Sequence, residues 1–281
     1  VQYSVPPSSR PLCLDVYRRT QADGADPVII FLHGGSWARG DSRASRPLKR
    51  FPWVLASIAA RGFVVAAIEY RMVGEALWPA QGQDVNSAVR FLRKNAAQFG
   101  AAADRIAVWG VSCGGHLAGI AATTAAIVEL ASQDPALAEI DGAVQAAVSW
   151  FGGFNMETLT EQCEAQPGCH LRNDRRSPEW TLLGGLPEEV GVERLRSASP
   201  AYYASADSAP MLIIAGDNDI LIPAAQSVEM AEVLNAAGGK VQLEILPGVG
   251  HDFAGATYEE TLAANQKAMG ITLEYFDRCF R

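Results

Sequence analysis

The sequence predicts an α/β fold in which a mostly parallel central sheet is covered by helices on both faces. Short apolar runs recur along the chain and alternate with longer segments of helical period. Apolar runs of this length are typical of strands that are buried on both faces. Strands that alternate with helices imply right-handed crossover connections within one sheet. The predicted strands cover residues 12–18, 28–32, 63–68, 106–109, 143–151, 211–215 and 241–246.

The helical segments fill the intervals between these strands. One of them starts at Pro223 and stops at Gly238 and Gly239, which are typical start and stop signals. The chain therefore predicts a single domain that covers residues 1–281. The predicted helices cover residues 47–60, 79–99, 114–130, 223–237 and 257–276.

One segment, residues 152–199, breaks the alternation of strands and helices. It has no strand pattern, contains several Pro and Gly residues, and is too long for an ordinary connection. We expect it to be a cap that is inserted over the strand ends, and a partly disordered loop is the alternative. Trp180, Leu182 and Leu183 favour at least one packed helical turn there.

Composition excludes several classes of function. Of 281 residues, 49% are hydrophobic and 19% are charged, which is enough to bury a core without metals or disulfides. The net charge of -8, without any basic run, does not favour nucleic acid as a partner. The apolar runs are of strand length, so no membrane span is expected. No metal or other cofactor is predicted, and nothing in the sequence indicates an oligomeric state.

Two of the five cysteines, Cys163 and Cys169, lie six residues apart in a segment that contains Pro and Gly. A small loop closed by a disulfide is sterically easy at this spacing, and two free thiols are the alternative. A disulfide would indicate an exported protein, because disulfides persist in oxidising compartments. Nothing else in the sequence indicates the cellular compartment.

The strongest chemical signal is Gly110-Val111-Ser112-Cys113-Gly114, which matches G-x-S-x-G between a predicted strand and a predicted helix. This motif places a serine on a tight strand-to-helix turn, where small neighbours let the backbone pass close by. The helix that follows directs N–H groups toward an oxygen that becomes negative. We expect Ser112 to be a nucleophile.

A second signal, His33-Gly34-Gly35-Ser36-Trp37, follows the strand at residues 28–32. The N–H groups of Gly34, Gly35 and Ser36, together with that of Cys113, are candidate donors of an oxyanion hole. Glycine allows the close approach of backbone that such a hole needs. We interpret His33 as a structural residue that holds the loop.

Serine catalysis also needs a base and an acid that orients the base. Of four histidines, His251 lies in a loop directly after the last strand, where a base can reach over the sheet. His116 is expected to be structural, and His170 lies in the cap. Asp217 and Asp219 both follow the strand at residues 211–215, and we favour Asp219 because Asp217 can serve the turn itself.

These motifs resemble an α/β-hydrolase of the carboxylesterase group that bears an H-G-G-x-W oxyanion motif. The group includes lipase/esterase-like and feruloyl-esterase-like enzymes, and kynurenine formamidases share the motif. The resemblance covers nearly the whole chain and implies a Ser112–His251–Asp219 triad. Similar enzymes usually carry Ala at the position of Cys113, and they tie an arginine such as Arg71 to an acid on the next helix, here Asp84.

The resemblance implies a serine carboxylesterase that acts on a small ester with short-chain acyl or aryl groups. Trp37 is the expected substrate-binding residue, and Trp78, Phe154 and Trp180 are expected to give the pocket an aromatic mouth. An aryl formamide hydrolase similar to kynurenine formamidases is the first alternative. A non-catalytic binding protein of the same fold is a more remote one, because such proteins usually lose the nucleophile or the base.

Overall fold

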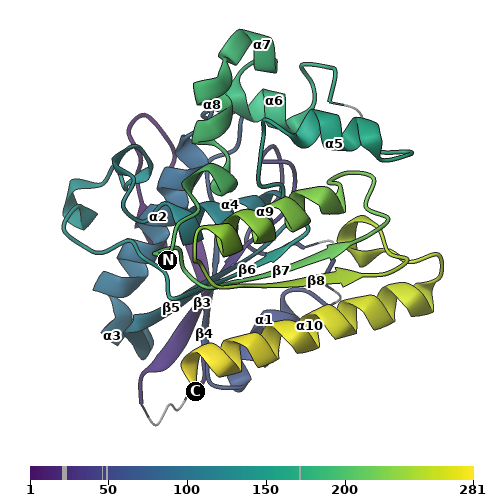
Figure 1. The fold of residues 1–281 in the computed structure, drawn as a ribbon. Coiled ribbons are helices and arrows are strands. Elements are labelled where there is room, and N and C mark those ends of the chain that lie inside the picture. Colours follow the sequence, from purple (N-terminus) through teal and green to yellow (C-terminus); the bar gives the residue numbers. More distant parts are fainter. Residues whose placement is uncertain (21–23, 46, 49, 171) are drawn as a thin grey trace.

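Eight strands form one sheet in the described part of the chain, in the order β1-β2-β4-β3-β5-β6-β7-β8 (Figure 1). The computed structural model describes residues 1–20, 24–45, 47–48, 50–170 and 172–281. β1 and β2 pair antiparallel, β2 pairs antiparallel with β4, and the other neighbours are parallel, which confirms the predicted fold class. The strands are β1 Gln2–Ser4, β2 Leu12–Tyr17, β3 Asp26–Leu32, β4 Val64–Ile68, β5 Ala101–Val111, β6 Ala146–Trp150, β7 Met211–Gly216 and β8 Val241–Leu246.

Helices cover the sheet on both faces. Figure 1 shows α2, α4 and α9 on one side of the sheet, and α1 and α10 on the other. The helices outside the cap are α1 Trp53–Ala60, α2 Ala80–Lys94, α3 Ala96–Phe99, α4 Cys113–Thr123, α9 Ala224–Ala236 and α10 Tyr258–Phe280.

The alternation of side chains along each strand divides the core into two layers. In β3, Val28, Ile30 and Leu32 belong to the layer beneath α2 and α4, whereas Ile29 and Phe31 belong to the layer beneath α1 and α10. All five side chains have no exposed area. An apolar run without polar interruption is therefore required, because both faces of the strand are covered.

Helix boundaries differ from the sequence prediction where side chains compete with the backbone. The segment predicted as one helix over residues 114–130 ends at Thr123, where Thr123 and Thr124 donate hydrogen bonds back to the carbonyls of Gly119 and Ile120. Such bonds favour the end of a helix. The segment 79–99 is likewise divided, at Asn95, whose side chain donates to the Phe91 carbonyl.

In its described residues, the segment between β6 and β7 contains four short α-helices and the 3-10 helix Pro200–Tyr203, and the four α-helices lie above α4 and α9 in Figure 1. We call residues 152–199 the cap. Trp180, Leu182 and Leu183 of the cap are all buried, which attaches α6 to the rest of the protein. The cap helices are α5 Leu159–Ala165, α6 Pro178–Leu183, α7 Pro187–Val190 and α8 Val192–Ser197.

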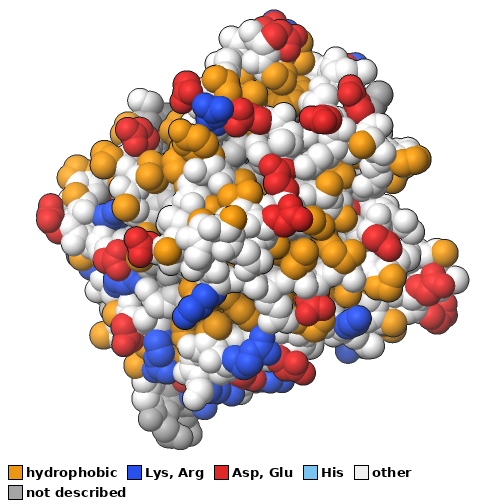
Figure 2. Space-filling model, in the orientation of Figure 1, with side chains coloured by type: hydrophobic (Ala, Val, Ile, Leu, Met, Phe, Trp, Pro, Cys, Tyr) orange, Lys and Arg blue, Asp and Glu red, His pale blue; other side chains and the backbone are white. Residues whose placement is uncertain are grey.

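Acidic side chains are scattered over the face shown in Figure 2, and basic ones gather along its lower edge. Near the C-terminus, Arg61 and Arg281 form ion pairs with Asp277. None of the helices in the described residues has the length and apolar character needed to cross a membrane.

Candidate functional site

Ser112 occupies a strained turn between β5 and α4. Its φ and ψ angles are 56° and -122°, a conformation that costs energy for a residue other than glycine. The turn is possible because a Cβ on Gly110 would lie 1.9 Å from the Gly114 carbonyl oxygen, and one on Gly114 would lie 2.1 Å from that of Leu32. The Ser112 N–H donates to the Trp150 carbonyl at 2.9 Å. The serine is thus held by backbone contacts on both sides.

The structure brings His251 and Asp219 to Ser112. His251 Nε2 lies 3.0 Å from Ser112 Oγ, and His251 Nδ1 lies 2.7 Å from Asp219 Oδ2. Asp219 is fully buried, and its Oδ1 accepts hydrogen bonds from the N–H groups of Leu221 and Ile222. An Nδ1–H that donates to the carboxylate leaves Nε2 free to accept the serine proton.

Asp217, the competing acid, lies apart from the histidine ring. Its Oδ1 accepts a hydrogen bond of 2.7 Å from the Gly248 N–H, which ties the loop after β7 to the turn after β8. Asp217 therefore serves the turn, and Asp219 is the carboxylate beside His251.

The other histidines lie away from the serine hydroxyl. His33 is buried, stacks on Tyr70 and places Nδ1 2.9 Å from the Gly34 carbonyl oxygen. His116 Nε2 donates to the Ala198 carbonyl at 2.8 Å. Burial lowers the pKa of both rings, that of His116 to about 4, so both are neutral at pH 7. His170 is exposed and lines a cavity beside Ser112.

The loop after β3 lies against the Ser112 turn. A Cβ on Gly34 would lie 3.1 Å from the Val111 carbonyl oxygen, and one on Gly35 would lie 2.0 Å from that of Arg39. Within the described residues, the N–H groups of Gly35 and Cys113 donate to no backbone carbonyl. These two amides are therefore available to an incoming oxygen.

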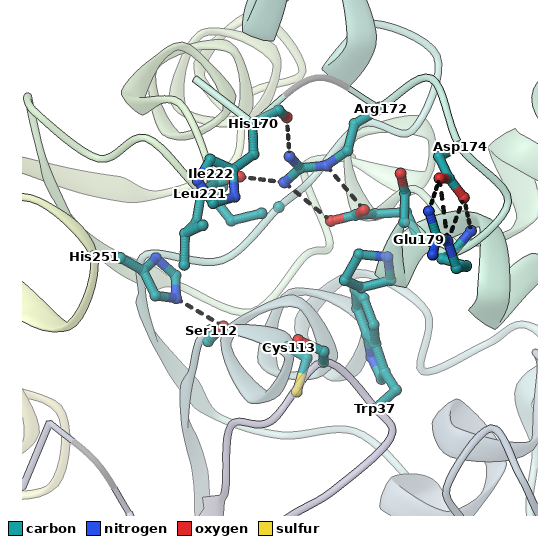
Figure 3. Close-up of a pocket in the computed structure, with 15 residues that line it drawn as sticks. Trp37, Ser112, Cys113, His170, Arg172, Asp174, Glu179, Leu221, Ile222 and His251 are labelled. Atoms are coloured by element: carbon teal, nitrogen blue, oxygen red, sulfur yellow. Dashed lines mark hydrogen bonds and ion pairs between the residues drawn. The ribbon is translucent and has the colours of Figure 1, made fainter. Parts of the chain in front are cut away.

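The Cys113 side chain points away from the cavity, beneath the loop (Figure 3). Its Sγ lies 3.4 Å from the Tyr70 hydroxyl, close to the N–H groups of Ser36 and Trp37. Burial raises the pKa of the Cys113 thiol, so the group stays protonated and unreactive at pH 7. Only the backbone of Cys113 faces the site.

Two cavities meet at Ser112, with volumes of about 480 and 350 Å³. Ser36, Ser112, Leu221 and His251 line both of them. The larger cavity is also lined by Trp37, Cys113, Gly153, His170, Arg172, Asp174, Arg176, Ser177, Pro178, Glu179 and Ile222. The smaller one is also lined by Gly34, Gly35, Arg39, Gly40, Ala44, Ser45, Pro47, Val111 and Asp252.

The prediction that Trp78, Phe154 and Trp180 give the pocket an aromatic entrance is wrong. Trp37 lines the larger cavity, where its indole extends toward Glu179 (Figure 3). Trp78, Phe154 and Trp180 do not line it and are at most 2% exposed, because they pack in the core between the cap and the sheet. Charged side chains from the cap take the place that was expected for aromatic rings.

Sequence reasoning missed the buried pair Arg172 and Glu179, whose side chains are 5% and 3% exposed. No motif marks them, since their importance arises from contacts across the fold. The Arg71–Asp84 pair is confirmed, with a shortest N–O distance of 2.8 Å, and both residues are buried. In the described chain, no group of three or more His, Cys, Asp or Glu residues is arranged to hold a metal ion.

Cys163 and Cys169 are both free thiols in the structure, and their side chains are near enough to interact. Burial, and secondly the contact with Cys169, raise the pKa of Cys163 to about 12. A disulfide between them is therefore not present here, although the two side chains are adjacent.

Comparison with known proteins agrees with this architecture. The profile of the family described as BD-FAE matches residues 14–234, and that of the dienelactone hydrolase family matches residues 191–280. The chain belongs to the BD-FAE family. Its fold is the α/β-hydrolase fold, as expected from its motifs.

Three proteins illustrate the relationship of this BD-FAE chain to others. Esterase LipC of Mycobacterium tuberculosis is 33% identical over 85% of the chain and 56% of its own length. Ethyl acetate hydrolase of Pseudomonas putida is 33% identical over 85% of the chain and 70% of its own length. A truncated carbohydrate esterase from gut microbiota is 29% identical, with a TM-score of 0.75 over 92% of this chain and 90% of that one. The chain spans about half the length of the first curated relatives it matches.

Proposed function

We propose that the protein is a serine carboxylesterase that hydrolyses short-chain acyl or aryl esters. The observation that carries this proposal is an unbroken hydrogen-bond chain from the buried Asp219 carboxylate through His251 to Ser112 Oγ. This series of hydrogen bonds ends at Ser112 Oγ, where two cavities meet. An ester has an acyl part and an alkoxy part on either side of its carbonyl carbon, which matches the two cavities. The names of LipC and of ethyl acetate hydrolase support the same reaction class.

The reaction begins when His251 Nε2 accepts the Ser112 proton while Oγ bonds to the carbonyl carbon. The carbonyl π electrons move onto oxygen, and the N–H groups of Gly35 and Cys113 stabilise the negative charge. Gly34 and Ser36, on either side of Gly35, supply the backbone that shapes this oxyanion hole. Each donor stabilises the transition state by about 3 kcal/mol. The imidazolium is stabilised by Asp219.

Collapse of the tetrahedral intermediate breaks the bond to the alkoxy oxygen, which takes the proton from His251 Nε2. The alcohol leaves, and an acyl-enzyme remains on Ser112. Water then attacks this ester with His251 again acting as base, and the acid and the free serine are released.

The charge in the larger cavity favours short acyl groups over long alkyl chains. Arg172 and Glu179 contribute a buried ion pair to its wall, and Asp174 adds a further carboxylate. An alkyl chain placed against these groups would displace water from them without offering hydrogen bonds in return. Trp37 is the tryptophan in this lining, and although its side chain is largely buried, the part that lines the cavity can pack on an acyl or aryl group.

The direct test is hydrolysis of p-nitrophenyl esters of increasing acyl length by the wild-type protein and by Ser112→Ala. We expect kcat/KM to be greatest for the short acyl groups. The Ser112→Ala variant should lose activity by about a million-fold in kcat and should no longer be labelled by an organophosphate. Full hydrolysis by Ser112→Ala would overturn the proposal, and a maximum at long chains would overturn the preference. Parallel assay of N-formylkynurenine separates ester from formamide hydrolysis.

A further inference from the structure

A buried ion pair joins the cap to the loop that carries the proposed catalytic acid. Arg172 Nε donates to Glu179 Oε2 of α6 at 3.0 Å, and the two residues are 6% and 2% exposed. The same guanidinium donates to the carbonyls of His170 and Leu221. Figure 3 shows the Arg172 side chain extended between Leu221 and Glu179.

Leu221 belongs to the loop of residues 219–222, which we call the acid loop. The Leu221 N–H donates to Asp219 Oδ1 at 2.8 Å, so a shift of Leu221 would be transmitted to the carboxylate. The other oxygen of that carboxylate holds His251 Nδ1. Arg172 is thus two hydrogen bonds away from the proposed acid, Asp219, and three away from the proposed base, His251.

The cap donates a hydrogen bond to each of the first three carbonyl groups of the acid loop. The Gln166 side chain donates to the Asp219 carbonyl at 2.7 Å, and the His170 N–H donates to the Ile220 carbonyl at 2.8 Å. Arg172 completes the series at Leu221. Three successive carbonyls therefore receive their hydrogen bonds from one short stretch of the cap.

We infer that the cap positions the catalytic acid and that Arg172 is the principal positioning residue. The inference rests on the proposed function, because it assigns Arg172 an effect on the triad of that reaction. Arg172 differs from the other two tethers in having a buried carboxylate partner, and its own carbonyl accepts a 2.8 Å hydrogen bond from Trp180 Nε1. Its guanidinium is therefore fixed before any substrate arrives.

This role predicts a defect in turnover more than in binding. A displacement of about 1 Å in a catalytic group can cost on the order of a hundredfold in rate. The substrate carbonyl would still meet Ser112 and the oxyanion donors, so KM for a small ester would change little. A fall in kcat at nearly constant KM distinguishes positioning from substrate contact.

The test replaces the whole ion pair, because loss of one partner alone would leave a buried charge unpaired. The double variant Arg172→Met/Glu179→Leu substitutes apolar side chains that can keep the cap packed, and its folding is checked by circular dichroism and thermal melting. The kcat for p-nitrophenyl acetate is then measured per active site titrated by organophosphate. We expect a ten- to hundredfold lower kcat with little change in KM, and partial recovery in Arg172→Lys.

The matched control is Arg175→Gln, which removes an ion pair elsewhere in the cap. Arg175 pairs with Glu189, its side chain is 64% exposed, and it does not line either cavity. This variant should keep the wild-type kcat and KM. Gln166→Met provides a second variant that leaves the buried pair intact, and we expect a smaller fall in kcat from it.

Wild-type kcat per titrated site in the folded double variant would overturn the inference, and so would a rise in KM alone. Should the double variant not fold, unchanged kcat in Gln166→Met would overturn it, and a lower kcat at constant KM would support it. Absence of ester hydrolysis by the wild-type protein is a different result, which would overturn the proposed function instead.

Discussion

The Ser112 turn and the acid loop are held in different ways. The turn is held by backbone that fits only because Gly110 and Gly114 have no side chains. The acid loop is held largely by bonds from the cap, two of which come from the side chains of Gln166 and Arg172. Because the turn requires glycine at fixed positions, it can be recognised as a motif in the sequence. The side chains that hold the acid loop come from a distant segment, and no local sequence pattern marks them.

After the loss expected for Ser112→Ala, the largest effect distinguishes Asp219 from Asp217. Asp219→Asn should lower kcat by about ten-thousandfold, because the amide would favour the wrong tautomer of His251. Asp217→Asn should retain activity, since an amide oxygen can still accept the hydrogen bond from Gly248. Steady-state kinetics on p-nitrophenyl acetate measures both. The reverse order of effects would show that Asp217 is the acid.

Next in size is the effect of a single methyl group at the turn. Gly114→Ala would place Cβ 2.1 Å from the Leu32 carbonyl oxygen and 2.6 Å from that of His33, where only backbone could yield. We expect destabilisation of more than about 4 kcal/mol, or no folded protein. The matched control is Gly270→Ala in α10, where a Cβ meets nothing within 4 Å and should stabilise by about 0.5–1 kcal/mol. Urea unfolding compares them, and equal stabilities would refute the steric account of the turn.

A smaller effect concerns His116, which joins α4 to the cap through the Ala198 carbonyl. Burial lowers its pKa from 6.5 to about 4, so the unfolded chain binds the proton more tightly than the folded protein. The stability that depends on the neutral ring is complete above pH 6.5 and is lost as the pH falls toward 4. The expected loss is about 3 kcal/mol. Urea unfolding at pH 7 and pH 4 should show a smaller difference in His116→Gln, and an equal difference would contradict this assignment.

The smallest effect concerns the thiols of Cys163 and Cys169, which flank the Gln166 tether. Oxidation by glutathione disulfide would join them, with release of two molecules of glutathione. A loop of this size stabilises the folded state by roughly 2 kcal/mol when closed. Thiol titration under denaturing conditions should show two fewer thiols, with a modest rise in Tm that Cys169→Ser abolishes. An unchanged thiol count would show that the pair stays reduced, which would contradict this prediction.

These contrasts explain what could be predicted from sequence. The sheet and the positions of Ser112, Asp219 and His251 at the strand ends follow from apolar runs and tight turns, whose residue requirements are local. The end of α4 at Thr123 was missed because hydroxyl groups bond back to the helix within an Ala-rich pattern. The pair Arg172 and Glu179 was missed because a charged residue in a cap sequence resembles a solvated surface residue until the fold buries it.

Leu221 carries a consequence for any attempt to alter this protein. Its side chain lines both cavities, while its N–H holds Asp219 and its carbonyl receives Arg172. One residue thus lines both cavities and contacts the proposed acid through its backbone. A side-chain substitution at Leu221 would keep both backbone groups, so it could reshape the cavities while the acid stays in place. A substitution that shifts the backbone, or Leu221→Pro, which removes the N–H, would also disturb Asp219.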